Sequence, residues 1–559
     1  MKKIRFLFLC VLLGGAISLF AQSPVNNEKN PVPSAVTIDS SNLPLVLMKL
    51  PFLWPTWDPI PDTPKVTVDM GVIDNGYNAI NHVADPKNVY LGKIGIEKRG
   101  SISQAFWYSQ KSYGFETRDT LGNNLDAVLL NMPKEHDWVL YAPFDDHTLM
   151  RNVVTYELAR EMGYYAPRTK FCEVQFYDWA WTPDYRGLYV MMEKIKRDKN
   201  RVNISKLDAN DNSGDSLTGG YIFAVDKNIW ASDSGWVSKK DTGVFFTYKY
   251  PKGDVITPQQ KSYIQSYVDS FETALKGPSF ADPATGYKKY IDETSFMDFF
   301  FIQELSKNID GYKRSSYLYK DKNSKDKKIY AGPHWDYNSA WNVHLCGFDS
   351  VAGWDYPKSC WVNAAYHVPF WWGRFLQDSS YTHDLKCRWM YLRSTVLDTT
   401  NIFHIMDSIS GYISTASVRH FSQFTINTTL KVEVDSLKLW IAARLAWMDA
   451  NMPGNCWNLG TTEEKNFENS FSIYPNPVSE NMNVDFYLGT EKNIRIELLD
   501  AVGRKMQTIK ETTFLPGSHT LSLNLKNYSP GLYLLQVSDP SYTAGSGTTL
   551  FTRKRIHTE

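Results

Sequence analysis

The chain has 559 residues with 60 basic and 60 acidic side chains, so its formal net charge is zero. This balance argues against a protein that binds nucleic acid through bulk positive charge, and the length allows about two to four domains. Because 43% of the residues are hydrophobic and 14% are aromatic, we expect most of the chain to fold around large cores.

The first 21 residues have the pattern of an export signal. Three basic residues open it, an apolar stretch over 6–20 follows, and Ala21 precedes the expected cleavage point. A membrane anchor is the alternative, but this stretch is shorter than the ~20 residues that a spanning helix needs. No later stretch is long and apolar enough to span a bilayer. We therefore expect residues 1–21 to be a signal peptide and the mature chain to be exported, without a transmembrane segment.

Cleavage would leave five cysteines in the mature chain. They are Cys172, Cys346, Cys360, Cys387 and Cys456. An odd number leaves at least one unpaired, unless two chains are joined. Cys346 and Cys360 flank a short loop in which an exported protein can keep a disulfide. No Cys or Cys/His spacing indicates a zinc site.

Strand-like runs dominate the chain from residue 66 to about residue 250, after a Pro-, Asn- and Ser-rich linker or edge segment over 22–65. The runs cover 66–68, 94–97, 138–141, 171–176, 187–192 and 219–226. The Asn75-Gly76 pair between apolar residues predicts a hairpin. One run ends at Glu193, which could be a hinge that offers backbone groups to a nucleobase, or an ordinary strand end.

A Gly/Ser turn at Arg99, Gly100 and Ser101 precedes a strand-like run that begins near Lys111. Such a turn can cover phosphates with backbone N–H groups, while the lysine supplies a point charge. The alternative is an ordinary surface turn, since Gly-Ser turns are common. Glu157, on a predicted helix, could pair with Lys111 or could instead be solvated or locally paired.

The stretch 303–342 carries two acidic residues in different surroundings. Asp310 ends an apolar-periodic helix, and Asp336 follows a strand-like run and lies between two aromatic residues. Short strands over 317–319 and 328–330 predict a β-hairpin with one carboxylate at each base. Two such carboxylates can face one pocket and suit metal-assisted phosphoryl transfer, in which one orients a hydroxyl and the other holds Mg²⁺. The alternative is two separate aspartates that cap turns.

Helical patterns prevail from about residue 258 to residue 450. The expected helices span 258–275, 288–308 and most of 370–450, and an earlier one spans 149–162. A β-rich part followed by an α-rich part predicts an α+β domain over 66–450, with two lobes and a cleft between them.

The last part of the chain has a different pattern. Residues 451–470 are polar and punctuated by Gly and Pro, which indicates a linker. From 471 to 559 short alternating strands recur at about 8–12-residue spacing, which is typical of a small β-sandwich. The strands are expected near 483–487, 494–498, 500–503, 519–525 and 531–537, and a basic tip closes the chain at 553–555.

The C-terminal segment contains Tyr474-Pro475-Asn476-Pro477, Asp500 to Arg504, Pro530 to Tyr533 and the basic end. These motifs resemble the type A sorting domain of the type IX (Por) secretion system of Bacteroidota, an Ig-like sandwich. The resemblance implies export across the inner membrane by the signal peptide and passage through the outer membrane by the sorting domain. The protein would then be secreted or attached at the cell surface, with the type IX secretion machinery as a partner.

Short motifs also follow one another between about 90 and 450. They are Ile96 to Ser101, Lys111 to Tyr113, Leu149 to Asn152, Arg186 to Val190, Glu193 to Ile195, Gly219 to Tyr221, Asn308 to Asp310 and Trp335 to Asn338. Together they resemble the CotH kinase family, which is distantly similar to protein kinases. The resemblance implies a two-lobed, atypical kinase-like domain that uses ATP and Mg²⁺ to phosphorylate Ser or Thr in exported proteins.

The same resemblance implies roles for individual residues. The catalytic set would be Asp310 as catalytic aspartate, Lys111 on the ATP phosphates and Asp336 on Mg²⁺. The residues expected to bind the nucleotide are Arg99, Gly100, Ser101, Lys111 and Glu193, and those expected to bind metal are Asp336 and Asn338.

Two functions fit the sequence. The first is an exported Ser/Thr protein kinase. The second is a catalytically weak or inactive surface protein that uses a kinase-like scaffold for binding or structure. Its motivation is Ser315, which stands five residues after Asp310, where kinase-like sites usually carry asparagine, and the absence of a GxGxxG loop. A hydrolase is a distant third, because the sequence has no GxSxG or HExxH motif.

Overall fold

The computed structural model divides the chain into two compact units, residues 1–454 and 455–559. In the first unit the structure describes residues 36–51, 60–77, 79–100, 104, 109–227, 235–358 and 367–454. In the second it describes 455–456, 472–476, 478, 480–488, 491–500, 505–526, 528–529, 531–538 and 553–558. The expected signal peptide and Ser101 lie outside these described residues.

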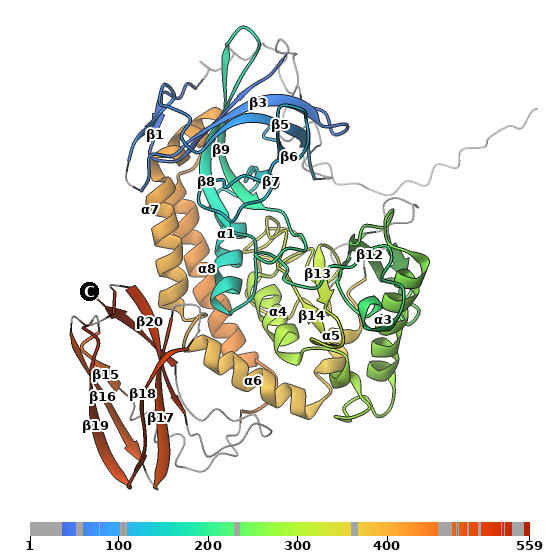
Figure 1. Ribbon diagram of the computed structural model, residues 1–559, viewed down its shortest axis with the longest axis vertical. Helices are drawn as coiled ribbons and strands as arrows, with labels where there is room; N and C mark the ends of the chain where they lie inside the picture. Colours follow the sequence, from blue (N-terminus) through green and yellow to red (C-terminus); the bar gives the residue numbers. More distant parts are fainter. Residues whose placement is uncertain are drawn as a thin grey trace, which may run out of the picture. The chain divides into compact units, whose positions relative to one another are not determined.

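Seven strands of the first unit close into a barrel in the order β2-β3-β5-β6-β7-β9-β8 (Figure 1). They are β2 (Leu45–Lys49), β3 (Val66–Ile73), β5 (Tyr90–Lys98), β6 (Tyr113–Arg118), β7 (Asp137–Tyr141), β8 (Thr169–Tyr177) and β9 (Pro183–Glu193). Neighbouring strands are antiparallel except β2 and β8, which are parallel. The expectation of a β-rich first part is confirmed. Because the barrel closes, β2 has a partner on both sides and is not a sheet edge.

Strand β9 belongs to the barrel and also packs against the rest of the first unit. Its residues Tyr189 and Met191 belong to the core inside the barrel. Its residues Leu188, Val190 and Met192 point the other way and belong to the large core formed with the helices. The alternation of side chains along a strand therefore places the C-terminal end of β9 between two hydrophobic cores.

A second sheet has five strands in the order β11-β12-β10-β13-β14. The strands are β10 (Tyr221–Val225), β11 (Gly235–Val237), β12 (Phe245–Tyr250), β13 (Ser316–Lys320) and β14 (Ile329–Ala331). The expected hairpin is confirmed, with Tyr319 opposite Tyr330. The run predicted at 219–226 pairs with this hairpin through β10 and β13, so it lies outside the barrel. Two short strands, β1 (Ser40–Ser41) and β4 (Asn81–His82), pair with each other.

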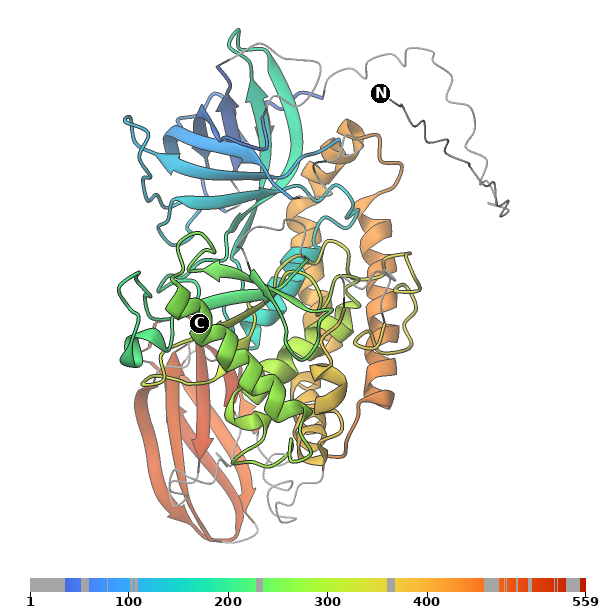
Figure 2. The same ribbon diagram turned by 90° about the vertical axis from the view of Figure 1, so that its right-hand side faces the viewer.

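The helices surround this sheet and the outer face of β9 (Figures 1 and 2). They are α1 (Arg151–Glu161), α2 (Gly214–Leu217), α3 (Pro258–Lys276), the 3₁₀ turn η2 (Tyr287–Lys289), α4 (Glu293–Ser306), α5 (Trp371–Phe375), α6 (Ser379–Arg393), α7 (Thr399–Gln423) and α8 (Leu430–Asn451). Local signals fix several helix starts. For example, Thr257 and Gln260 form a capping box at α3. The helical second part of the first unit agrees with the expectation.

The second unit contains the sheets β15-β16-β19 and β18-β17-β20-β21. Its strands are β15 (Ser472–Tyr474), β16 (Asn481–Leu488), β17 (Lys492–Asp500), β18 (Lys505–Phe514), β19 (Gly517–Asn524), β20 (Gly531–Ser538) and β21 (Arg553–Thr558). Apolar residues of both sheets share one core, so the sheets pack face to face. Strand β18 was not expected, because most of its residues are polar and its few apolar residues do not alternate regularly. The strand expected at 500–503 is the end of β17 at Asp500, and 501–504 lie outside the described residues.

The cysteines of the described chain fall into two groups. Cys172 is free and buried. Cys346, Cys387 and Cys456 are disulfide-bonded, and Cys360 lies outside the described residues. The expectation of at least one unpaired cysteine is confirmed. Over the part of the chain that the structure describes, none of the helices has the length and apolar character required to cross a membrane.

Candidate active site

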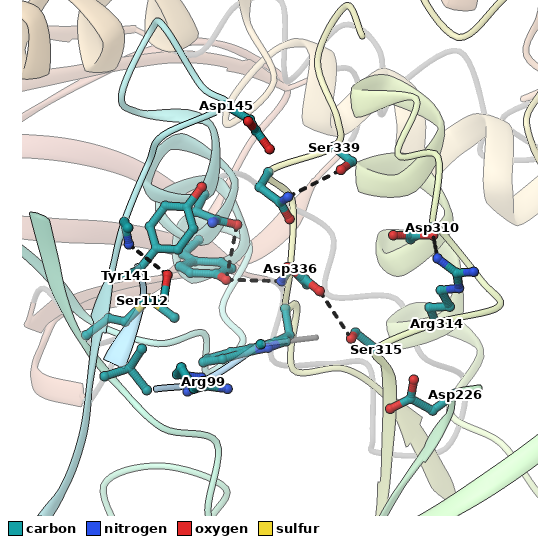
Figure 3. Close-up of a pocket in the computed structure, with 18 of the residues that line it drawn as sticks. Arg99, Ser112, Tyr141, Asp145, Asp226, Asp310, Arg314, Ser315, Asp336 and Ser339 are labelled. Carbon is teal, nitrogen blue, oxygen red and sulfur yellow. Dashed lines mark hydrogen bonds and ion pairs between the residues drawn. The ribbon is translucent and has the colours of Figure 1, made fainter. Parts of the chain in front are cut away.

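A pocket of about 210 Å³ opens between the barrel and the five-stranded sheet (Figure 3). The barrel side supplies Arg99, Gly100, Gln110, Ser112, Val139, Tyr141 and Met192. The opposite side supplies Asp226, Asp310, Arg314, Ser315, Asp336 and Asn338, and α1 supplies Asn152 and Tyr156. Most of the polar groups singled out above therefore meet in one place, although they are far apart in the sequence.

The two carboxylates at the base of the hairpin both line this pocket. Helix α4 ends at Ser306, where Lys307 takes a left-handed conformation, and Asp310 lies in the turn that follows. One oxygen of Asp310 accepts a hydrogen bond from the Arg314 guanidinium at 2.9 Å. Strand β14 then returns the chain to Asp336 on the other flank. The hairpin thus brings together two acids that are separated by 26 positions in the sequence.

The main chain at Asp336 is fixed by helix α1. The amide of Asp336 donates to the Tyr156 hydroxyl at 3.2 Å, and the amide of Tyr337 donates to Asn152 Oδ1 at 2.7 Å. Arg151 donates to the carbonyl of Asn338 at 3.2 Å. Three consecutive residues of this segment are therefore hydrogen-bonded to side chains of one helix, which holds the Asp336 carboxylate in the pocket.

Backbone strain is concentrated at the same place. Tyr312, Ser315 and Asp336 have φ values of 67°, 47° and 69°, in the left-handed region that side-chain-bearing residues seldom adopt. Each such residue costs on the order of 1 kcal/mol or more and persists only where its surroundings enforce it. Strain of this kind is typical of a functional site.

Asp336 is electrostatically unusual. Partial removal from water and the nearby negative charges of Asp310 and Asp226 raise its pKa to about 6, although Arg99 and Ser315 favour the ionised form. Ser315 donates its hydroxyl to Asp336 at the long distance of 3.5 Å. Burial and two nearby carboxylates therefore make the ionised form of Asp336 costly, which is the condition under which a bound cation is stabilised.

Asp226 was not among the residues expected in the site. This residue directly follows β10, lines the pocket and pairs with Lys249 at 2.9 Å. Its position directly after a run of five buried residues was a usable signal, because functional groups often stand at the end of a buried strand. The pairing of β10 with the hairpin strand β13, which brings Asp226 next to the site, has no local signature.

Some of the residues expected to bind the nucleotide line the pocket, and others do not. Arg99 and Gly100 line the pocket, and the Arg99 guanidinium lies over the Trp335 ring, 5.3 Å from its centroid. Lys111 is buried and does not line the pocket, although its neighbours Gln110 and Ser112 do. Its ammonium donates to the Gln104 carbonyl at 3.3 Å.

Two glutamates have local partners. Glu193 is completely buried at the end of β9 and accepts hydrogen bonds from the Arg168 amide at 3.1 Å and from its guanidinium at 2.8 Å. Its side chain holds the strand end in place and does not line the pocket. Glu157 pairs with Arg160 on its own helix, as the local alternative predicted.

Asn338, Ser315 and Asp336 present amide, hydroxyl and carboxylate oxygens to the pocket. The Asn338 amide nitrogen donates to the Ser339 hydroxyl at 3.3 Å, so the oxygen is the atom left to bind a metal. Hard oxygen donors that include a partly desolvated carboxylate are the chemistry that Mg²⁺ prefers. The residues present therefore fit a magnesium ion.

A second acidic group lies elsewhere, on the barrel. Asp126, Glu135 and His136 place ligand atoms within 4.8 Å of one another. However, the Lys196 ammonium lies 3.0 Å from Glu135 and 3.2 Å from His136. The lysine supplies the positive charge there, so ion pairing accounts for this cluster.

A buried ionic cluster at the C-terminal end of α4 holds the segment 350–356 in place. Arg444 donates to the carbonyls of Val351 and Gly353 at 2.7 and 2.8 Å, and Lys307 donates to those of Ser350 and Ala352 at 2.8 and 3.0 Å. Glu304 accepts from the amides of Asp355 and Tyr356 at 2.7 and 3.0 Å. Because Lys307 and Glu304 close helix α4, the same cluster fixes the start of the turn that carries Asp310.

Two known families match the chain. Residues 472–545 match the Secretion system C-terminal sorting domain, which indicates a secreted or cell-surface protein exported by the type IX system. Residues 96–448 match the family described as CotH kinase protein. A search of curated proteins gave no match. Since the family match covers more than half of the chain and includes both hairpin carboxylates, the chain belongs to the CotH kinase protein family.

Proposed function

We propose that this protein is an exported atypical kinase that transfers the γ-phosphoryl group of ATP to Ser or Thr residues of secreted or surface proteins. The observation that carries the proposal is the convergence of Asp310, Asp336 and Arg99 on one pocket. Family membership supports phosphotransfer, and the sorting domain supports an exported acceptor.

The proposal includes the domain architecture. The barrel is the β-rich lobe, and the helices with the five-stranded sheet are the second lobe of a kinase-like domain. Because β2 is a barrel strand, this domain begins before the expected boundary at residue 66 and extends to about residue 450. A linker over 451–470 and an Ig-like sorting domain over 471–559 follow. The pocket lies where the two lobes meet, which is the usual place for a ligand site between substructures.

In this proposal Arg99 takes the phosphate-binding role that the family resemblance implied for Lys111. Arg99 lines the pocket and interacts with the charge of Asp336, whereas Lys111 donates to a carbonyl outside it. A guanidinium suits phosphate oxygens because it can donate two hydrogen bonds at once. Gly100 allows the main chain to approach the phosphates. Val139 and Met192 provide an apolar surface for the nucleobase.

Asp310 is the proposed base for the acceptor hydroxyl. It orients the hydroxyl and takes its proton while the oxygen forms a bond to the γ-phosphorus. The bond from that phosphorus to the oxygen shared with the β-phosphate breaks, and ADP leaves. Arg314, bonded to Asp310 at 2.9 Å, fixes the direction of the carboxylate.

Asp336 and Asn338 are the proposed metal ligands, with Asp226 adding negative charge. A magnesium ion held by Asp336 and Asn338 would supply positive charge to the phosphate groups of the nucleotide. Within the described residues, the oxygens of Asp226, Asp310 and Asp336 do not form a group that lies entirely within 4.8 Å.

The test is transfer of radiolabel from γ-labelled ATP to casein and to the chain itself, with purified full-length protein and Mg²⁺. We expect label in the wild type and none above background in Asp310→Asn and Asp336→Asn. Asp435→Asn, an exposed carboxylate on α8, is the matched control and should retain full transfer. Equal labelling by the wild type and both pocket variants would refute the kinase.

A surface binding protein without catalysis is the second candidate. It is favoured by the position of Lys111 outside the pocket and by Ser315 in place of a metal-binding asparagine. A thermal-shift screen separates the two functions. Stabilisation by Mg-ATP supports the kinase, and stabilisation by glycans without any response to Mg-ATP supports the binding protein.

A further inference from the structure

A second pocket of about 570 Å³ adjoins the first one. Arg99 and Trp335 line both cavities, and Trp335 directly precedes Asp336 in the chain. The second pocket is otherwise lined by residues from three segments, the end of β9, the end of β12 with the turn that follows it, and strand β13. The Arg99–Trp335 pair is therefore a boundary that the two pockets share.

The second pocket is rich in positive charge. Its lining contains four cationic side chains, Arg99, Lys194, Lys249 and Lys252, and one carboxylate, Asp254. Lys249 pairs with Asp226 at 2.9 Å and Lys194 with Asp137 at 3.6 Å. Arg99 is in turn attracted by Asp336 and Glu97. The basic character of the pocket therefore lies in the lining itself, which has four cations and one carboxylate.

The cations also influence one another. Burial lowers the pKa of Lys194, and the positive charges of Arg99, Lys65 and Lys252 lower it further, while Asp137 opposes the change. Like charges gathered in a partly desolvated pocket repel one another, and an anion placed among them relieves the repulsion.

Aromatic rings hold the cations in position. The Arg99 guanidinium lies 5.3 Å from the centroid of the Trp335 ring, and the Lys249 ammonium lies 5.6 Å from that of Tyr317. Cation–π contacts of this kind restrict long side chains without neutralising them. The pocket is thus a preorganised anion site, which reduces the entropy lost on binding.

We propose that this basic pocket binds an acidic side chain of the acceptor protein, either Asp, Glu or phosphoserine, that lies near the phosphorylated Ser or Thr. The proposal rests on the proposed kinase function. The phosphates of the nucleotide have to meet the metal at Asp336, which lines only the first pocket. The neighbouring cationic pocket is then left for the acceptor. The protein should therefore select acidic substrate segments.

The test is direct binding of labelled Ser peptides, measured by fluorescence anisotropy with the full chain. One peptide has Glu residues on both sides of Ser, a second has Lys residues and a third has Ala residues. We expect the wild type to bind the Glu peptide at least about tenfold more tightly than the Lys peptide, with a preference that weakens as salt is added.

Charge reversal at the pocket should change this preference. Lys252→Glu alters an exposed side chain at the pocket rim and should remove or invert the preference for the Glu peptide. Lys194→Glu should act in the same direction, and its melting temperature is measured because Lys194 is paired with Asp137. Lys431→Glu, an exposed site on α8, is the control and should bind like the wild type.

Nucleotide binding is the second arm of the test. Mg-ATP affinity of Lys252→Glu should equal that of the wild type. If this variant loses Mg-ATP affinity and keeps the wild-type peptide preference, the pocket serves the nucleotide phosphates and the proposal is wrong. It is also wrong if the wild type binds the Glu and Lys peptides equally. Because peptide binding needs no phosphoryl transfer, failure of the kinase function would be seen separately, in the radiolabel assay.

Discussion

Glu304 and Asp336 are acidic residues of the same unit, and their surroundings differ in kind. Glu304 is completely buried and accepts hydrogen bonds from two amides and from the Tyr312 hydroxyl, opposite Arg444. Asp336 is half-buried, and within the described chain its carboxylate accepts a 3.5 Å bond from Ser315 and lies near other acids. The first group has its charge and hydrogen bonds matched by the fold. The Asp336 carboxylate keeps a negative charge that a bound cation can balance.

This difference separates a structural cluster from a candidate catalytic one. Buried charges that are fully hydrogen-bonded hold segments in a single arrangement, whereas a carboxylate with a raised pKa in a cleft is characteristic of active sites. The strained backbone at Asp336 points in the same direction. The same carboxyl-to-amide substitution should therefore have opposite effects on stability at the two positions.

The largest expected effect is the loss of transfer in Asp336→Asn. Removing the charge that we propose to hold Mg²⁺ should lower the rate of phosphoryl transfer by about 10³-fold or more. The measurement is initial velocity with labelled ATP at saturating Mg²⁺. A variant that keeps a tenth of the wild-type rate would show that Asp336 is not the principal metal ligand.

The same variant should be more stable than the wild type in the absence of metal. A carboxyl whose pKa is raised in the folded state binds its proton more tightly there than in the unfolded chain. Its ionisation therefore lowers stability as the pH rises from about 4 through 6, and the full loss persists above pH 6. Asparagine removes this loss, which is about 1–2 kcal/mol after allowance for partial exposure. A higher denaturation midpoint at pH 7.5 would confirm it, and a lower one would contradict the contrast with Glu304.

Glu304→Gln should destabilise the first unit by about 3 kcal/mol, because buried Arg444 loses its ion-pair partner and the Asp355 and Tyr356 amides lose a charged acceptor. The measurement is the midpoint of denaturant unfolding, followed by tryptophan fluorescence. Glu433→Gln, a surface position on α8, is the matched control and should change the midpoint little. An unchanged midpoint in Glu304→Gln would mean that the ionic cluster is not needed to hold the segment 350–356.

Magnesium affinity should fall at low pH through Asp336. Below a pKa of about 6 a proton competes with the metal for this carboxylate, so the apparent affinity should drop by roughly tenfold per pH unit as the pH falls further. Asp226→Asn should move this transition to lower pH, because it removes one of the negative charges that raise the pKa of Asp336. Titration of Mg²⁺ between pH 5 and 8 with a fixed concentration of ATP is the measurement. A transition at the same pH in wild type and Asp226→Asn would exclude this electrostatic coupling.

The smallest expected effect is at Ser315. Asparagine tolerates the left-handed backbone at this position better than serine does and offers an amide oxygen to a metal. Ser315→Asn should therefore raise Mg²⁺ affinity by a few-fold, and Ser315→Ala should leave it close to the wild-type value. The metal dependence of the initial velocity tests both variants. A loss of affinity in Ser315→Asn would show that the pocket has no room for the longer side chain.

The sequence allowed part of this site to be predicted. Asp310 and Asp336 could be paired because the hairpin between them has a local pattern, two short strands joined by a polar loop. Lys111 is an example of a residue whose position could not be predicted from the sequence. Gln110 and Ser112 line the pocket while Lys111 between them does not, and this short segment precedes β6 without regular secondary structure. Its conformation depends on the elements around it, so the sequence does not contain that information locally.

Four features could be predicted from the sequence alone. They are export by the type IX system, the order of the β-rich and helical parts of the first unit, the final β-sandwich, and the hairpin with its two acids. These features follow from interactions between residues that are close in the chain, such as caps, alternation and turns. The tertiary structure alone decided that Arg99 and Asp226 join the two acids, that Lys111 does not, and that a basic pocket lies next to them. The reason is that barrel closure and the pairing of β10 with β13 unite segments more than 90 positions apart, and their contacts depend on how whole elements pack.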